Sequence, residues 1–120
     1  MKDTTMGKLL DSVATMHPSV AQPFIQMRRA IASAGSLSDR ERELCMLAAL
    51  VAVQNRDAIE THVARAVALG ISRDDVHHAV LTGLGIASVL SHAVTVLEWV
   101  DAWFVAHEGN SGAKTAEERQ

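Results

Sequence analysis

The chain has 120 residues and a formal net charge of −3, so its length indicates a single domain and its charge gives no support to nucleic-acid binding. Alanine is abundant, proline is rare and there are few aromatic residues, which favours an all-α fold with an aliphatic core. No apolar stretch of about 18 residues is free of charges and histidine, which argues against a membrane span.

Helix-start and helix-stop signals predict about six helices in one bundle. A first amphipathic helix is expected over 3–16, and a second runs to about Ala34. Ser38 followed by Glu41 forms a capping box, which predicts the start of a third helix that runs to about Gln54. The predicted ranges of the remaining helices are 56–69, 73–82 and 86–106.

Two of these helices are expected to carry most of the packing. The third contains LCMLAALVAV, which is apolar nearly all round, so we expect it to be the buried central helix. The last helix is apolar over a wide arc and needs more than one partner, which we interpret as a subunit interface. Residues 1–108 are assigned to a single helical domain, and the polar stretch 109–120 to a disordered tail.

Glu43 and His62 are the first candidates for chemistry. Glu43 shares its helix face with apolar residues, so its carboxylate is expected to be partly desolvated, although a first-turn glutamate can simply complement the helix dipole. His62 lies on the same helix face as Asn55 and Ala58, at positions i, i+3 and i+7. Histidine is the usual general acid or base near neutral pH, and the alternative here is a structural histidine of the core.

The other histidines are weaker candidates. His92 lies at the border of an apolar face, where it either faces a pocket between helices or subunits or stays partly exposed. His77 and His78 are adjacent and point in different directions, so both are expected on the surface. Zinc bound by Glu43, His62 and His92 is chemically possible, but no spacing requires it. No metal and no cofactor is therefore predicted.

The single cysteine, Cys45, excludes an internal disulfide and fits a reducing compartment. The first residues also lack the apolar core of a signal peptide, so a cytoplasmic location is expected. Because Cys45 lies in an apolar run, we expect it to be a small buried hydrophobic residue. Without a second cysteine, a dithiol redox cycle within the chain is not available.

The segment LSDRERELCMLAALVAVQNRDAIETHVARAVALGISRDDVHHAVLTGLG resembles the carboxymuconolactone decarboxylase and alkylhydroperoxidase D-like superfamily. The resemblance covers about residues 36–90, and the preceding PFIQMRRAIASAG fits the leading helix of that family. It implies an all-α fold that assembles as trimers or hexamers. It also implies sites at the junctions of helices and subunits.

In the peroxidase branch of that family, a glutamate twelve residues before the first cysteine joins a C-x-x-C pair and a histidine in a proton relay. The glutamate and the histidine match Glu43 and His62, but the two cysteine positions hold Asn55 and Ala58. Peroxidase and disulfide reductase chemistry needs a thiolate, so it is not expected. The decarboxylase branch also lacks the dithiol, carries a segment similar to Glu60–His62, and is the closer branch.

The resemblance and these residues together lead us to expect cofactor-independent decarboxylation of a small lactone or organic acid, with His62 as general acid and Glu43 orienting or tuning it. We expect the substrate to contact Asn55, Ala58, His92 and Arg65. An anionic substrate also needs a cation nearby. The candidates are Arg65, Arg56 on the same helix, and Arg28 or Arg29 from a neighbouring subunit.

Two alternatives remain open. In the first, the chain is an oligomeric relative that kept the fold and lost the chemistry. In the second, it is a peroxidase-related antioxidant protein that uses Cys45 with an external thiol. An enzyme is expected to bring Glu43 and His62 together beside a concave pocket, whereas a redox protein requires Cys45 to be accessible.

Overall fold

The computed structural model describes the backbone of residues 5–119 and the side chains of residues 7–108. In chain order its helices are α1 (Thr5–Met16), α2 (Pro18–Ala32), α3 (Asp39–Val53), α4 (Arg56–Ala68), α5 (Arg73–Thr82) and α6 (Leu90–Arg119). The described residues contain no β-strand, and the predicted all-α fold is confirmed.

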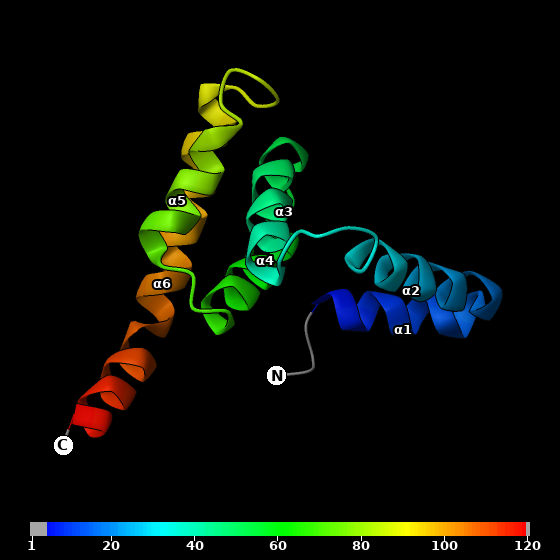
Figure 1. The fold of residues 1–120 in the computed structure, drawn as a ribbon, viewed down its shortest axis with the longest axis horizontal. Coiled ribbons are helices and arrows are strands. Elements are labelled where there is room, and N and C mark those ends of the chain that lie inside the picture. The colour runs from blue at the N-terminus through cyan, green and yellow to red at the C-terminus, as the bar shows by residue number, and fades with distance from the viewer. Residues whose placement is uncertain (1–4, 120) are drawn as a thin grey trace.

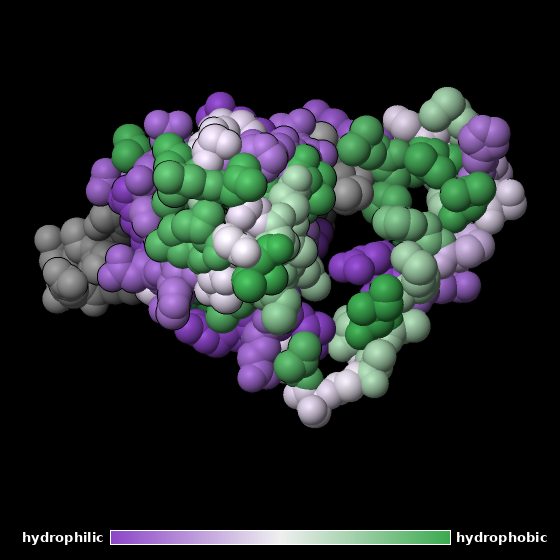
Figure 2. Space-filling view, turned by 90° about the horizontal axis from the view of Figure 1, so that it is seen from above, coloured by the Kyte–Doolittle hydropathy of each residue, from purple (hydrophilic) through white to green (hydrophobic). Residues whose placement is uncertain are grey.

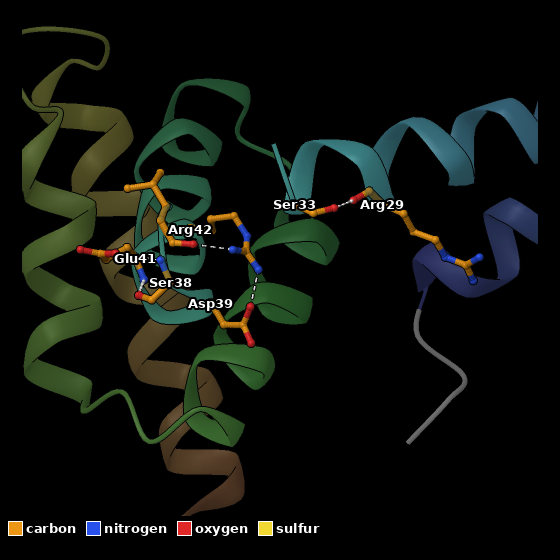
Figure 3. A network of polar contacts seen from close by, with 7 residues as sticks. Arg29, Ser33, Ser38, Asp39, Glu41 and Arg42 are labelled. Atoms are coloured by element: carbon orange, nitrogen blue, oxygen red, sulfur yellow. Dashed lines mark hydrogen bonds and ion pairs between the residues drawn. The ribbon is translucent and has the colours of Figure 1, made fainter. Parts of the chain in front are cut away.

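Capping residues set the starts of α3 and α5, and the cap of α3 is the predicted one. The Ser38 hydroxyl accepts a hydrogen bond from the Glu41 amide at 3.0 Å, and the Glu41 carboxylate accepts one from the Ser38 amide at 2.8 Å (Figure 3). At α5, the Ser72 hydroxyl accepts from the Asp75 amide at 3.1 Å. These bonds satisfy amides that have no partner within the helix, so both boundaries are set locally.

The core lies among α3, α4, α5 and α6, which pack against one another as the body of the molecule. Helices α1 and α2 form a hairpin that extends to one side of this body (Figure 1). The hairpin reaches the body through contacts between α1 and α4. The core cluster consists of Leu47, Val51, Ile59, Val63, Ala66, Ile71, Val76, Ala79, Val80, Val96 and Val100.

Helix α3 is less enclosed than its apolar sequence predicted. Glu43, Leu47 and Val51 are buried along one face, whereas Cys45 and Val53 are exposed on the rest of the helix. The reason is that α4, α5 and α6 cover only part of the surface of α3. The expectation of a helix buried nearly all round was therefore wrong.

The wide apolar arc of α6 is used mainly inside the chain. The helix packs against both α4 and α5, so Val96 and Val100 are fully buried and Trp99 and Trp103 pack against the core. Two helices of the same chain thus supply partners for part of the arc, and the interpretation of the arc as a subunit interface stays a prediction. Other apolar side chains of the helix stay open to solvent: Leu90, Val94 and Val105 are 66%, 45% and 62% exposed.

Helix α6 begins at Leu90 rather than at the predicted Ile86. The residues before it form a tight turn in which the amides of Ile86 and Ala87 donate to the carbonyl of Gly83. The helix continues to Arg119, beyond its predicted end at Ala106. The side chains of 109–120 lie outside the described residues. The assignment of 109–120 to a disordered tail, and with it the division of the chain at residue 108, stays a prediction.

Candidate functional site

A carboxylate and an imidazole meet where α3 packs against α4. Glu43 of α3 is only 6% exposed, and its Oε2 atom forms a hydrogen bond with Nδ1 of His62 on α4. If Glu43 is ionised, its carboxylate can only accept, and Nδ1–H of His62 is the donor of this bond. The structure thus joins the two candidate acid/base residues, although they are 19 positions apart in the chain.

The bond to Glu43 leaves Nε2 of His62 as the ring nitrogen available for a ligand. A carboxylate that holds the other nitrogen fixes both the tautomer and the orientation of the ring. Glu60, which is nearer in sequence, does not take part because its carboxylate pairs with Arg56 at 3.0 Å. The arrangement can therefore present a positioned imidazole whose positive charge would be compensated by Glu43.

His62 lines a cavity of about 380 Å³ at the place where the α1–α2 hairpin faces α3 and α4. Figure 2 shows the molecule hollowed between the hairpin and the helical body, with hydrophilic side chains at the opening. We call this space the site cavity. Its lining residues are Leu10, Phe24, Ile25, Arg28, Arg29, Ala32, Arg42, Met46, Thr61, His62 and Arg65. The volume is within the range of small-molecule sites.

Four arginines give the site cavity a positive wall. Arg42 is held in place because it donates to the carbonyl of Leu37 at 2.7 Å and pairs with Asp39 (Figure 3). Arg65 has no acidic partner among the described residues. Such a wall favours an anionic ligand, since an unpaired guanidinium can bind a carboxylate with two parallel hydrogen bonds.

The other two arginines of the wall, Arg28 and Arg29, come from α2 of the same chain. Neither forms an ion pair with a described residue. The expectation that they reach in from a neighbouring subunit is therefore not needed to explain their place at the site. Arg42 was missed, although its position directly before Glu43 was a signal in the sequence.

A second cavity of about 330 Å³ adjoins the first on the side of Glu43, and we call it the outer cavity. It shares Arg42, Met46 and Arg65 with the site cavity. His62 lines the site cavity and Glu43 lines the outer one, so the bonded pair lies between the two spaces.

Asn55 and Ala58 have a clear structural relationship at the start of α4. The Asn55 side-chain oxygen accepts a hydrogen bond from the Ala58 amide at 3.1 Å, which is a helix cap. Neither residue lines the site cavity. Their predicted contact with substrate stays a prediction, while Arg65, named for the same role, does line the cavity.

His92 lies apart from the Glu43–His62 pair. It lines a cavity of about 370 Å³ formed by the turn before α6, together with Ser88 and Val89. Among the described residues, no group of three or more His, Cys, Asp or Glu side chains is arranged to hold a metal ion. His92, Glu43 and His62 are thus not brought together as the three ligands considered from the sequence.

Cys45 is exposed, contrary to the expectation that it is buried. It lies beside the contact of α3 with α5 and lines a cavity of about 270 Å³ together with His78 and other residues of α5. The apolar neighbours of Cys45 in sequence face other directions around the helix, which is why the sequence was misleading. Accessibility, the condition for a redox role with an external thiol, is therefore met.

Fold and site together define an all-α protein with a buried carboxylate–imidazole pair beside an arginine-lined cavity. The sequence model of the carboxymuconolactone decarboxylase family matches residues 18–102. The chain belongs to the carboxymuconolactone decarboxylase family, as the resemblance predicted. Comparisons with curated proteins and with solved structures find no significant match. In the described part of the chain, every helix is too short or too polar to cross a bilayer.

Proposed function

We propose that this protein is a cofactor-independent enzyme that decarboxylates a small lactone or organic acid by acid/base catalysis. The observation that carries the proposal is the hydrogen bond between Glu43 and His62 at the wall of an arginine-lined cavity. Membership of a decarboxylase family supports the same reaction class.

In the proposed reaction the bond between the carboxylate carbon and its neighbour breaks, and carbon dioxide leaves. The electron pair of that bond passes to the remaining carbon and is delocalised into an adjacent carbonyl group of the substrate. Nε2–H of the protonated His62 then donates its proton to that carbon. Glu43 holds the ring by its Nδ1–H and stabilises the imidazolium, and solvent returns the proton to His62 after product release.

The arginine wall would bind and orient the anionic substrate. Arg65 lies one helical turn after His62 on α4, and Arg42 directly precedes Glu43 on α3, so both are close in sequence to the proton-handling pair. Oriented binding of this kind is a large part of enzymatic rate enhancement. A second carboxylate or a carbonyl oxygen of the substrate would be the group that these arginines hold.

We also propose that the protein self-associates, as a trimer or a hexamer. Large apolar side chains outside the proposed site are exposed on the hairpin and around the turn before α6; they include Met27, Ile31, Ile86, Val89 and Leu90. Ile86 is 89% exposed. Groups of exposed apolar side chains support a protein–protein contact.

The second candidate is an oligomeric relative without catalytic activity. It is favoured by one observation: the two positions that hold cysteines in the peroxidase branch serve here as a helix cap, with Asn55 accepting from the Ala58 amide. On this hypothesis the Glu43–His62 bond would stabilise the packing of α3 on α4 and do nothing further.

Release of carbon dioxide from a panel of γ-lactone carboxylic acids tests the proposal. The wild-type protein is expected to turn over at least one compound, and His62→Gln to reduce kcat roughly 10²- to 10⁴-fold. His78→Gln is the matched control, because His78 is exposed and lines a different cavity. Equal activity of His62→Gln and wild type would exclude His62 as the acid, and no turnover of any compound would favour the non-catalytic relative.

A further inference from the structure

The site cavity adjoins an apolar space, with which it shares the lining residues Leu10 and Phe24. This space lies between the two helices of the hairpin and has a volume of about 210 Å³. We call it the hairpin groove, and its lining residues are Leu9, Leu10, Val13, Val20, Ala21 and Phe24. All the described residues that line it have apolar side chains.

The order of the three spaces gives the site cavity two different ends. It shares Arg42 and Arg65 with the outer cavity, and it shares Leu10 and Phe24 with the hairpin groove. No residue lines both the outer cavity and the hairpin groove. One end of the site cavity is therefore charged and lies at the Glu43–His62 pair, and the other end is apolar and adjoins the hairpin groove.

The charged end suits one anionic group. Arg65 has no acidic partner among the described residues, and Arg42, already oriented by Leu37 and Asp39, adds positive charge. The buried carboxylate of Glu43 would repel an anion, but its hydrogen bond with His62 places the imidazole between it and the site cavity. A carboxylate at this end is therefore expected to bind to the two arginines, with the imidazole of His62 separating it from Glu43.

The apolar end suits a hydrocarbon group. Phe24 and Val20 are 39% and 56% exposed, so the groove leaves apolar surface in contact with water. A ligand tail that covers this surface gains affinity with every methylene group that it buries. The groove is thus matched to a tail that is attached to the group bound at the arginines.

We propose that the natural substrate is a carboxylate with an apolar tail, whose carboxylate binds at Arg42 and Arg65 beside His62 and whose tail passes Leu10 and Phe24 into the hairpin groove. This inference rests on the proposed function, since it assigns the substrate class of the same site. It adds the hairpin as the element that selects substrates by their apolar part.

Calorimetric titration of the full chain with butanoate, hexanoate, octanoate and octylamine tests the inference without requiring turnover. Affinity is expected to rise about two- to fourfold per methylene from butanoate to octanoate. Octylamine is expected to bind at least tenfold more weakly than octanoate, because the site cavity carries positive charge. A flat dependence on chain length, or equal binding of the amine, would overturn the inference.

Two variants locate the binding. Val20→Gln is expected to remove the chain-length dependence, whereas Val105→Gln, which changes a valine of similar exposure on α6, is expected to keep it. Arg65→Gln is expected to weaken binding of all three acids about equally. An unchanged chain-length dependence in Val20→Gln would overturn the inference.

Sedimentation of the same samples separates a ligand groove from a subunit contact. If Val20→Gln dissociates an oligomer and wild type does not bind octanoate, then a second copy of the chain occupies the groove and the inference is overturned. Failure of the decarboxylation assay can be distinguished from failure of this inference. The assay tests the proposed reaction, whereas the titrations test binding of the acids and do not depend on turnover.

Discussion

The carboxyl group of Glu43 on α3 and the imidazole of His62 on α4 share a hydrogen bond, and both side chains are largely shielded from water. Each residue is the only described hydrogen-bonding partner of the other's side chain. Removal of either one leaves a polar group in a poorly hydrated place. The pair therefore contributes to the packing of the two helices as well as to the proposed chemistry.

A double-mutant cycle measures this relationship. Glu43→Ala and His62→Ala are each expected to lower the free energy of unfolding by about 1–3 kcal/mol, because each leaves its partner unsatisfied. The double variant is expected to cost less than the sum by about 0.5–3 kcal/mol. Urea unfolding followed by circular dichroism gives all four values. The control is the cycle for Arg56 and Glu60, an exposed pair whose coupling is expected to be at most about 0.5 kcal/mol.

Asn55→Ala is expected to lower the free energy of unfolding by about 0.5–2 kcal/mol, because the Ala58 amide loses its cap. Asn55→Asp keeps a side-chain oxygen at the same place and is the matched control, with stability close to wild type. Thermal unfolding checks both. If Asn55→Asp is stable but loses substrate binding, Asn55 contacts the substrate in addition to capping α4.

Asp101 of α6 is expected to make stability depend on pH. Partial burial acts to raise its pKa, but hydrogen bonds from His77 and Arg73, together with their charge, outweigh it and hold the pKa below the ordinary carboxyl value of 3.8. A group with a lowered pKa in the folded state adds stability above its unfolded pKa, and this stability is lost as the pH falls through the folded pKa.

Asp101→Asn is thus expected to lower the free energy of unfolding by at most about 1 kcal/mol at pH 7, since the carboxylate is partly exposed. The difference from wild type is expected to shrink as the pH falls below about 4. Urea unfolding at pH 7, 5, 4 and 3 measures it. A difference that is constant or grows toward pH 3 would contradict the assignment. At pH 7, Asp11→Asn on the exposed face of α1 is expected to change stability by less than about 0.5 kcal/mol.

Gly70→Ala is expected to destabilise the protein by about 1 kcal/mol. Gly70 has φ +81° where α4 ends, and its amide donates to Val67 at 3.0 Å while the Ile71 amide donates to Ala66 at 3.0 Å. A Cβ atom there would meet no neighbour, so the cost comes from backbone conformation alone. Differential scanning calorimetry tests it, with Gly35→Ala as the control.

Gly35 also has open space around its Cα atom but no positive φ. Its replacement by alanine is expected to be neutral or slightly stabilising, because it reduces the freedom of the unfolded chain. Equal effects of the two substitutions would show that the left-handed conformation of Gly70 is not what ends α4.

The sequence by itself determined the local features of this protein. Ser38, Asn55 and Ser72 each cap a helix through a bond to a residue three positions later, so their effect depends on a few neighbouring residues. The order of the helices and the family are also visible without coordinates, because they depend on periodicity and on a long matching segment. Glu43 and His62 were recognisable as candidates by their chemistry and their match to the family.

The tertiary structure decided which of these residues meet. The bond from Glu43 to His62 depends on how α3 packs on α4, and the arginine wall depends on where the hairpin docks against both helices. The exposure of Cys45 and the enclosure of α6 by α4 and α5 followed from the same packing. Such contacts join residues far apart in the chain, and apolar faces of similar composition do not specify which partner each will bury.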